Sequence, residues 1–399
     1  MLDVRKMNPL PAFIIALPVV LIFLAMFEHP VFAETPSESI TQKQTEMVDT
    51  QEIENYWNRL MDEYSGFFPE SEKPSFSDML TKGTEALSIK DIFTGLSRFF
   101  LHEILFSGKL LVTIVILTVF SMILETLQNA FERNNVSKVA YAISYIVLII
   151  IAINSFTVAI DYAKSAIASM IHFMVGMIPI LLTLLASMGN IVSVSIMHPL
   201  IIFMIHSVGT MIYTIIFPLM FFSAVLHIAS SLSDKYKVTQ LANLLRRVSI
   251  AILGVMLTIF LGILSVRGAT GAITDGITIR TAKYVTGNFV PVVGRMFSDA
   301  TDTVITASLL AKNAIGLSGV IIIVMLCAFP ALKILALALI YNLSGAIMQP
   351  LGDSPIVTCL QTIGKSLIYI FAALASVGLM FFLSITIMIM ASNVSVMVR

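Results

Sequence analysis

Two short motifs contain residue types that could do chemistry, and each lacks a required member. Residues 364–366 (GKS) resemble the end of a phosphate-binding loop, but Cys359 occupies the position of the loop's first glycine. Residues 102–103 (HE) resemble the start of a zinc-protease helix, but Phe106 stands where the second histidine is needed. The sequence therefore predicts neither a nucleotide-binding loop nor a zinc-protease site.

The remaining metal-ligand residue types are too widely spaced to form a site. His198 and His206 lie eight residues apart on one predicted helix, more than two turns, and His227 lies at the far end of the next predicted span. Cys327 and Cys359 are the only cysteines, and both fall in apolar segments. These patterns favour hydrogen bonding between helices and burial of the thiols. We expect no cofactor, no metal and no catalytic residue.

The composition is typical of a protein with several membrane spans. Of the 399 residues, 57% are hydrophobic and 12% are charged, and the mean hydropathy is +0.94. The net charge of zero conceals an asymmetry. Residues 34–103 contain 14 acidic and 6 basic side chains, whereas residues 104–399 contain 8 acidic and 16 basic ones. The chain thus has an acidic head and a basic membrane body, and we expect no nucleic-acid partner.

The N-terminus resembles an export signal. A short basic region, an apolar stretch over residues 10–27 and small residues at 31 and 33 predict cleavage of residues 1–33, between Ala33 and Glu34. The apolar stretch is also nearly long enough to remain as an uncleaved anchor. In both cases residue 34 and those that follow begin outside the cytoplasm.

Residues 34–103 are predicted to form a small, acidic, extracytoplasmic helical region. Ile53, Trp57, Leu60 and Tyr64 form one apolar stripe on a polar helix. The stripe could pack within a small helical domain, or Trp57, Leu60 and Tyr64 could dock a partner protein, because about seventy residues bury little apolar surface alone. A second amphipathic helix is expected after Ser88, a suitable N-cap.

We predict an all-α, polytopic bundle of transmembrane helices with about eight spans. Residues 104–266 form a first bundle of about six spans, and residues 317–399 contribute the last two. The apolar runs lie near residues 105–124, 139–160, 166–187, 191–209, 211–229, 248–266, 317–340 and 366–391. Basic residues in the connection 230–247 place it in the cytoplasm. The pair at 191–229 has almost no loop and could be a single long helix or a re-entrant hairpin.

Residues 267–316 form a connection that is too polar to span and too apolar to be a free linker. It is either a re-entrant or interfacial helical hairpin, or a plain extracytoplasmic connection. In the hairpin, the chain would turn at Pro291 and Gly294, and charged side chains would face one another or a wet lumen. The candidate lumen or packing positions are Asp275, Arg280, Lys283, Pro291, Gly294, Arg295, Asp299 and Asp302.

The block DGITIRTAKYVTGNFVPVVGRMFSDATDTV, residues 275–304, together with the signal, the acidic head and the long apolar body, resembles the stage III sporulation protein AE family of endospore-forming bacilli. The resemblance covers the whole chain. It implies a multi-pass subunit of the mother-cell membrane around the forespore, in a secretion-like channel assembly. The implied partners are the other stage III sporulation A-operon membrane proteins, stage II sporulation protein Q across the intermembrane space, and membrane lipid. It implies no catalytic residue.

Two functions therefore stay open. The first is a structural membrane subunit of a channel assembly that is needed for sporulation. The second is an autonomous secondary transporter or permease, for which the central spans lack the buried carboxylate that commonly couples transport to protons or sodium.

Overall fold

The computed structural model describes residues 50–68, 75–82, 88–130, 135–232, 237–289, 293–351 and 355–397. The chain divides into two units, residues 1–40 and 41–399, and every described residue belongs to the second. All regular elements in these ranges are helices, so the predicted all-α class is confirmed.

The head contains α3 (Gln51–Tyr64), the 3₁₀ turn η2 (Ser65–Phe67) and α4 (Phe76–Lys82). It leads into α5 (Ile89–Phe106), for which Ser88 is the N-cap, as predicted: its hydroxyl accepts a hydrogen bond from the Asp91 amide. We refer to α3, η2, α4 and α5 together as the head.

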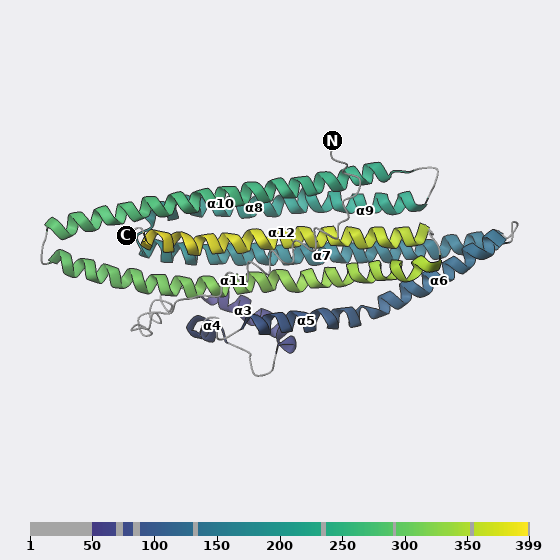
Figure 1. Ribbon diagram of the computed structural model, residues 1–399, viewed down its shortest axis with the longest axis horizontal. Coiled ribbons are helices and arrows are strands. Elements are labelled where there is room, and N and C mark those ends of the chain that lie inside the picture. The colour runs from purple at the N-terminus through teal and green to yellow at the C-terminus, as the bar shows by residue number, and fades with distance from the viewer. Residues whose placement is uncertain are drawn as a thin grey trace. The chain divides into compact units, whose positions relative to one another are not determined.

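The body follows as long helices (Figure 1). They are α6 (Gly108–Ala130), α7 (Asn135–Ser187), α8 (Ile191–Met211), the π-helical turn η4 (Ile212–Ile216), α9 (Phe217–Leu232), α10 (Thr239–Phe289), α11 (Val293–Met348), the 3₁₀ turn η5 (Gln349–Leu351) and α12 (Pro355–Met397). In this bundle α12 packs against α7, α9, α10 and α11, and α11 also contacts the head helices.

The described residues contain six helical segments long and apolar enough to cross a membrane, fewer than the eight expected. The six are Lys90–Leu124, Ala142–Ser187, Ile191–Ser231, Thr239–Val266, Ile305–Met348 and Pro355–Met390. Two predicted pairs of spans are single segments. Residues 161–165 (DYAKS) are polar but include neither glycine nor proline, so α7 continues through them.

The second merged pair joins α8 to α9 through η4. Proline has no N–H and its ring clashes with the carbonyl four residues earlier, so Pro218 disturbs the helix at this point. A π-helical turn just before it widens the helix locally without ending it. The near absence of a loop at residue 210, noted in the sequence, reflects one continuous helix.

Merging the two pairs of predicted spans removes two membrane crossings. The side of the membrane therefore changes only for connections that lie between the two merged pairs. Six spans that start outside still place residues 233–238 in the cytoplasm, but they move the turn at residues 188–190 to the exported side. That turn is tight: Gly189 has φ 86° and its amide donates to the Ala186 carbonyl at 2.9 Å. The positive φ suits glycine, which has no Cβ.

Reporter fusions test this topology. A phosphatase that is active only outside the cytoplasm should be active when fused after Gly189, Thr286 or Arg399, and inactive after Lys237. The fusion after Gly189 is decisive because eight spans place it in the cytoplasm. An inactive fusion there, with active fusions at Thr286 and Arg399, would restore the eight-span arrangement.

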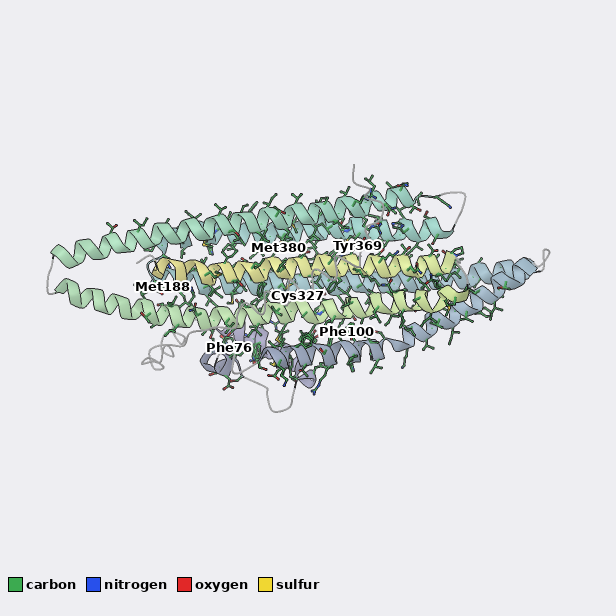
Figure 2. All side chains as sticks on the ribbon, viewed as in Figure 1. Phe76, Phe100, Met188, Cys327, Tyr369 and Met380 are labelled. Atoms are coloured by element: carbon green, nitrogen blue, oxygen red, sulfur yellow. The ribbon has the colours of Figure 1, made fainter. Side chains whose placement is uncertain are left out.

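Close packing of α11 on α12 depends on glycines. A Cβ at Gly378 of α12 would lie 2.9 Å from the Cβ of Cys327 and still closer to its Sγ, and one at Gly364 would lie 2.7 Å from the Asn342 side chain. Cys327 therefore lies between the two helices (Figure 2). Small residues bring helix backbones together and increase van der Waals contact in membranes.

The helices are much longer than one membrane requires. α7 has 53 residues and α11 has 56, which correspond to about 80 Å at about 1.5 Å per residue. The hydrocarbon core of a bilayer is about 30 Å thick. The predicted connection 267–316 is part of two such long helices, α10 and α11. Its described part is the end of α10 and the beginning of α11.

Candidate functional site

The strongest candidate site is the junction between the head and the body. The face of α3 that contains Trp57, Leu60 and Tyr64 is buried, with these side chains 0%, 4% and 7% exposed. It packs against α7 and α11 of the same chain. The body of the same chain therefore covers this face. Docking of a partner protein at Trp57, Leu60 and Tyr64 stays a prediction.

Five aromatic rings form the core of this contact, and we call them the aromatic junction: Tyr64, Phe67, Phe68, Phe99 and Phe329. The Tyr64 ring stacks on the Phe329 ring of α11, with centroids 3.8 Å apart. Phe99 of α5 meets both rings edge to face, at 5.6 Å and 5.0 Å. Such pairs contribute roughly 0.5–1.5 kcal/mol each beyond the area that they bury. One ring of α11 thus joins two head helices to the body.

The contact is tight and is bordered by charge. A Cβ at Gly95 of α5 would lie 2.8 Å from the Phe68 ring, so α5 approaches η2 closely. On the other side, the Lys333 ammonium lies 5.2 Å from the centroid of Tyr162 and 5.9 Å from that of Phe99. Cation–π attraction of this kind stabilises an ammonium beside aromatic faces.

The Tyr64 phenol is neutral in this setting. Burial raises its pKa far above the ordinary value, and the neighbouring Glu63 and the charge on Glu103 add to the effect. Desolvation and nearby negative charges both disfavour a phenolate. The ring that stacks on Phe329 is therefore an uncharged phenol.

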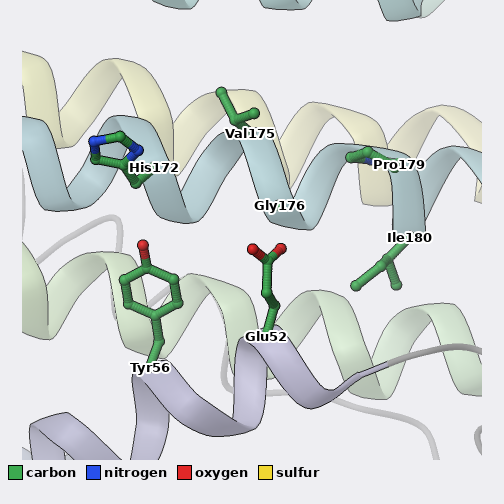
Figure 3. A pocket seen from close by; sticks show the side chains of 7 residues that line it. All are labelled: Glu52, Tyr56, His172, Val175, Gly176, Pro179 and Ile180. Atoms are coloured by element: carbon green, nitrogen blue, oxygen red, sulfur yellow. The ribbon is translucent and has the colours of Figure 1, made fainter.

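A pocket of about 400 Å³ opens beside the aromatic junction, between α3 and α7 (Figure 3). Glu52 and Tyr56 line it from α3. From α7 it is lined by His172, Val175, Gly176, Pro179 and Ile180. The Glu52 carboxylate lies against the bare backbone of Gly176, and a Cβ there would collide with it. Tyr56 meets Phe173 of α7 edge to face at 5.3 Å.

The chemistry of this pocket is modest. It combines one carboxylate, one phenol and one imidazole, all of which can bind water or a weakly held cation. Within the described ranges, no three His, Cys, Asp or Glu side chains gather in a way that could hold a metal ion. The pocket lies at the edge of the contact between α3 and α7.

The eight candidate lumen or packing positions divide between two helices. Asp275, Arg280 and Lys283 lie near the end of α10, and Gly294, Arg295, Asp299 and Asp302 lie near the beginning of α11. These helix ends lie at the same end of the bundle (Figure 1). Pro291 falls outside the described residues, as do Ala33 and Glu34 of the predicted cleavage site. A wet lumen at these positions and cleavage after Ala33 both stay predictions.

One buried charge was missed in the sequence. Lys312 of α11 is 0% exposed, and its ammonium donates a hydrogen bond to the Ile389 carbonyl of α12 at 2.7 Å. One turn earlier, Ser308 accepts a hydrogen bond from Ser187 of α7 at 3.0 Å. Lys312 belongs to the polar connection 267–316 in the sequence, and only the long, continuous α11 brings it into the interior.

Comparison with known proteins gives the family. The profile of the family described as stage III sporulation protein AE matches residues 71–392. The chain is also 53% identical over 367 residues to stage III sporulation protein AE of Bacillus subtilis (strain 168), covering 92% of each chain. The chain belongs to the stage III sporulation protein AE family. No solved structure matches it. The family resemblance seen in the sequence is thus confirmed, and the matched region contains α4, α5 and the body up to residue 392 of α12.

Proposed function

We propose that this chain is an integral membrane subunit of the channel assembly between the mother cell and the forespore. It lies in the mother-cell membrane and contacts the other stage III sporulation A-operon membrane proteins. Across the intermembrane space its partner is stage II sporulation protein Q. The observation that carries the proposal is the apolar surface of helices that extend well beyond one bilayer.

The head marks the exported membrane surface. It follows the predicted export signal, and its exposed Glu52 and Glu54 cannot lie in hydrocarbon. The head contacts α7 at Phe173 and α11 at Phe329. The bilayer therefore lies between these contacts and the cytoplasmic ends of the helices. On α11, 36 residues precede Phe329, about 54 Å of helix. This part lies outside the membrane.

The part outside the membrane still exposes large apolar side chains. Gly378 of α12 packs on Cys327 of α11, close to Phe329. The ring centroid of Phe381 of α12 lies 6.4 Å from that of Phe260 of α10. α10 beyond Phe260 is therefore exported as well. The residues it exposes include Val266 and Ile277, which are 65% and 57% exposed. Large apolar side chains that are exposed to water are typical of a protein–protein interface where they gather in a patch. We infer that neighbouring subunits cover it.

The transporter alternative has less support. A transporter that couples to protons or sodium commonly places a carboxylate inside the membrane. Among the described residues no carboxylate is fully buried, and Asp161 of α7 is exposed. A transporter that acts alone also has no neighbouring subunit to cover the exported apolar surface.

Site-specific photo-crosslinking tests the proposal. A photoreactive residue at Val266 or Ile277 should form adducts with one of the named sporulation proteins, or with a second copy of the chain, in sporulating cells. The matched control is Ile150 of α7, which is 60% exposed and lies near Tyr341 on the bilayer side. It should react mainly with lipid.

Affinity purification from the same cells provides the second measurement. The named proteins should be retained with the chain. Lipid adducts at all three positions, with a chain that purifies alone, would contradict the proposal and favour the transporter.

A further inference from the structure

The cytoplasmic end of the bundle holds a guanidinium in a fixed position. Arg246 of α10 is half-buried and donates a hydrogen bond to the Asn243 carboxamide oxygen one turn earlier. Its guanidinium carbon lies 5.1 Å from the centroid of the Tyr369 ring on α12. A ring face on one side and an amide on the other restrict the orientation of the guanidinium. Its remaining N–H groups are thereby held for one ligand.

The surrounding helices supply no negative charge. The sequence of α9, residues 239–266 of α10 and all of α12 contain no Asp or Glu. His227 of α9 lies close to Arg246 and can only be neutral or positive. Lys365 lies one turn before Tyr369 on α12 and adds a second, exposed positive charge. In sequence, the acidic residues nearest to these helix ends are Asp234 and Asp353, both outside the described residues.

Depth decides which anion can serve as the counterion. The candidate span in α10 begins at Thr239, and Arg246 lies seven residues further on, about 10 Å inside it. An arginine at this depth extends its long side chain toward the headgroup layer, where its half-buried cation meets lipid phosphates before it meets soluble anions. Arginine is suited to this ligand because its planar fork binds two phosphate oxygens at once.

We propose that Arg246 binds the phosphate group of an anionic phospholipid in the adjacent leaflet, with Tyr369 orienting the guanidinium and Lys365 adding to the local positive charge. The lipid lies between the cytoplasmic ends of α10 and α12. Arg247 is a different case. It is exposed, and the next position on a helix points about 100° away, so it contributes only general attraction to the membrane surface.

The experiment uses the full chain purified in detergent, with lipid retention measured by native mass spectrometry and stability by thermal unfolding. Addition of phosphatidylglycerol should raise the unfolding midpoint of the wild type, and phosphatidylcholine should not. Arg246→Gln should weaken phosphatidylglycerol binding about tenfold, the effect of a lost charge-assisted hydrogen-bonded pair. The phosphatidylglycerol affinity of Arg246→Lys should fall between those of the wild type and Arg246→Gln, because lysine keeps the charge and loses the planar fork.

Arg247→Gln is the matched control. It removes the same charge from the neighbouring residue and should change binding by less than about twofold. Equal losses for Arg246→Gln and Arg247→Gln would show general surface attraction and overturn the proposal. Inorganic phosphate that stabilises the wild type as well as phosphatidylglycerol does would show a free-anion site and overturn the lipid assignment.

Two further variants examine a protein counterion. If Asp234 or Asp353 neutralises Arg246, then Asp234→Asn or Asp353→Asn should increase phosphatidylglycerol binding, because each frees the guanidinium. Binding close to that of the wild type in both variants is the result expected for a lipid counterion. A marked increase in either would overturn the proposal.

Discussion

Replacing Phe329 with alanine should release the head from the body. The ring stacks on Tyr64 and meets Phe99 and Phe68, so its loss removes three aromatic contacts and leaves a cavity. Truncation of a buried phenylalanine costs roughly 3–5 kcal/mol. Because the head contacts the body mainly through this junction and α7, we expect protease to cut after Arg59 or Lys90 in the variant much faster than in the wild type. The body should stay in the membrane.

Phe93→Ala is the control for this variant. Phe93 lies on α5 and is 64% exposed, so the same substitution removes little packing. Its proteolysis should match that of the wild type. If Phe329→Ala leaves the head as resistant as Phe93→Ala does, then the aromatic junction does not hold the head.

Gly378→Leu should separate α11 from α12 and prevent stable folding of the body. The new side chain would collide with Cys327, whose Cβ lies 2.9 Å from the position of a Cβ at residue 378. Overpacking of a filled interior costs roughly 1–3 kcal/mol or more. The expected result is a lower unfolding midpoint in detergent and a smaller amount of the variant in the membrane fraction.

Gly262→Leu of α10 provides the comparison. No atom lies within 4 Å of a Cβ at Gly262, and leucine favours a helix by about 1 kcal/mol over glycine. This variant should accumulate normally with an equal or higher midpoint. Equal loss of protein in both variants would mean that membrane insertion, and not helix packing, is sensitive to glycine.

The sequence predicted the elements whose signals are local. Hydropathy identified the class, and Ser88 with Asp91 located the start of α5 to the residue, since a cap is a contact between neighbours in the chain. The spacing of Trp57, Leu60 and Tyr64 identified a buried face of α3. In each case the physical cause lies within a few residues of its effect.

Features that depend on distant segments were predicted less well. Nothing near Tyr64 shows that its ring stacks on Phe329, a residue of a helix more than two hundred residues later. Hydropathy predicts the end of a span at the polar residues 161–165, because it weighs polarity and not the continuity of backbone hydrogen bonds. In the sequence, nothing separates Arg246 from the other basic residues of the connection 230–247. Its stack on Tyr369 distinguishes it from Arg247, and only the packing of α10 on α12 brings those two residues together.

The great length of α7 has a consequence for how deeply the chain sits in a membrane. A helix of 53 residues contains many different windows of about 20 residues that could cross the hydrocarbon, so hydrophobic matching alone selects no single vertical register. The register must come from the few polar groups along its length. Asp161 and Lys164 lie at its midpoint, beside the ring of Tyr162 that Lys333 approaches. Moving these charges into the acyl chains is costly, and they act as a stop that sets the immersion depth of the whole bundle.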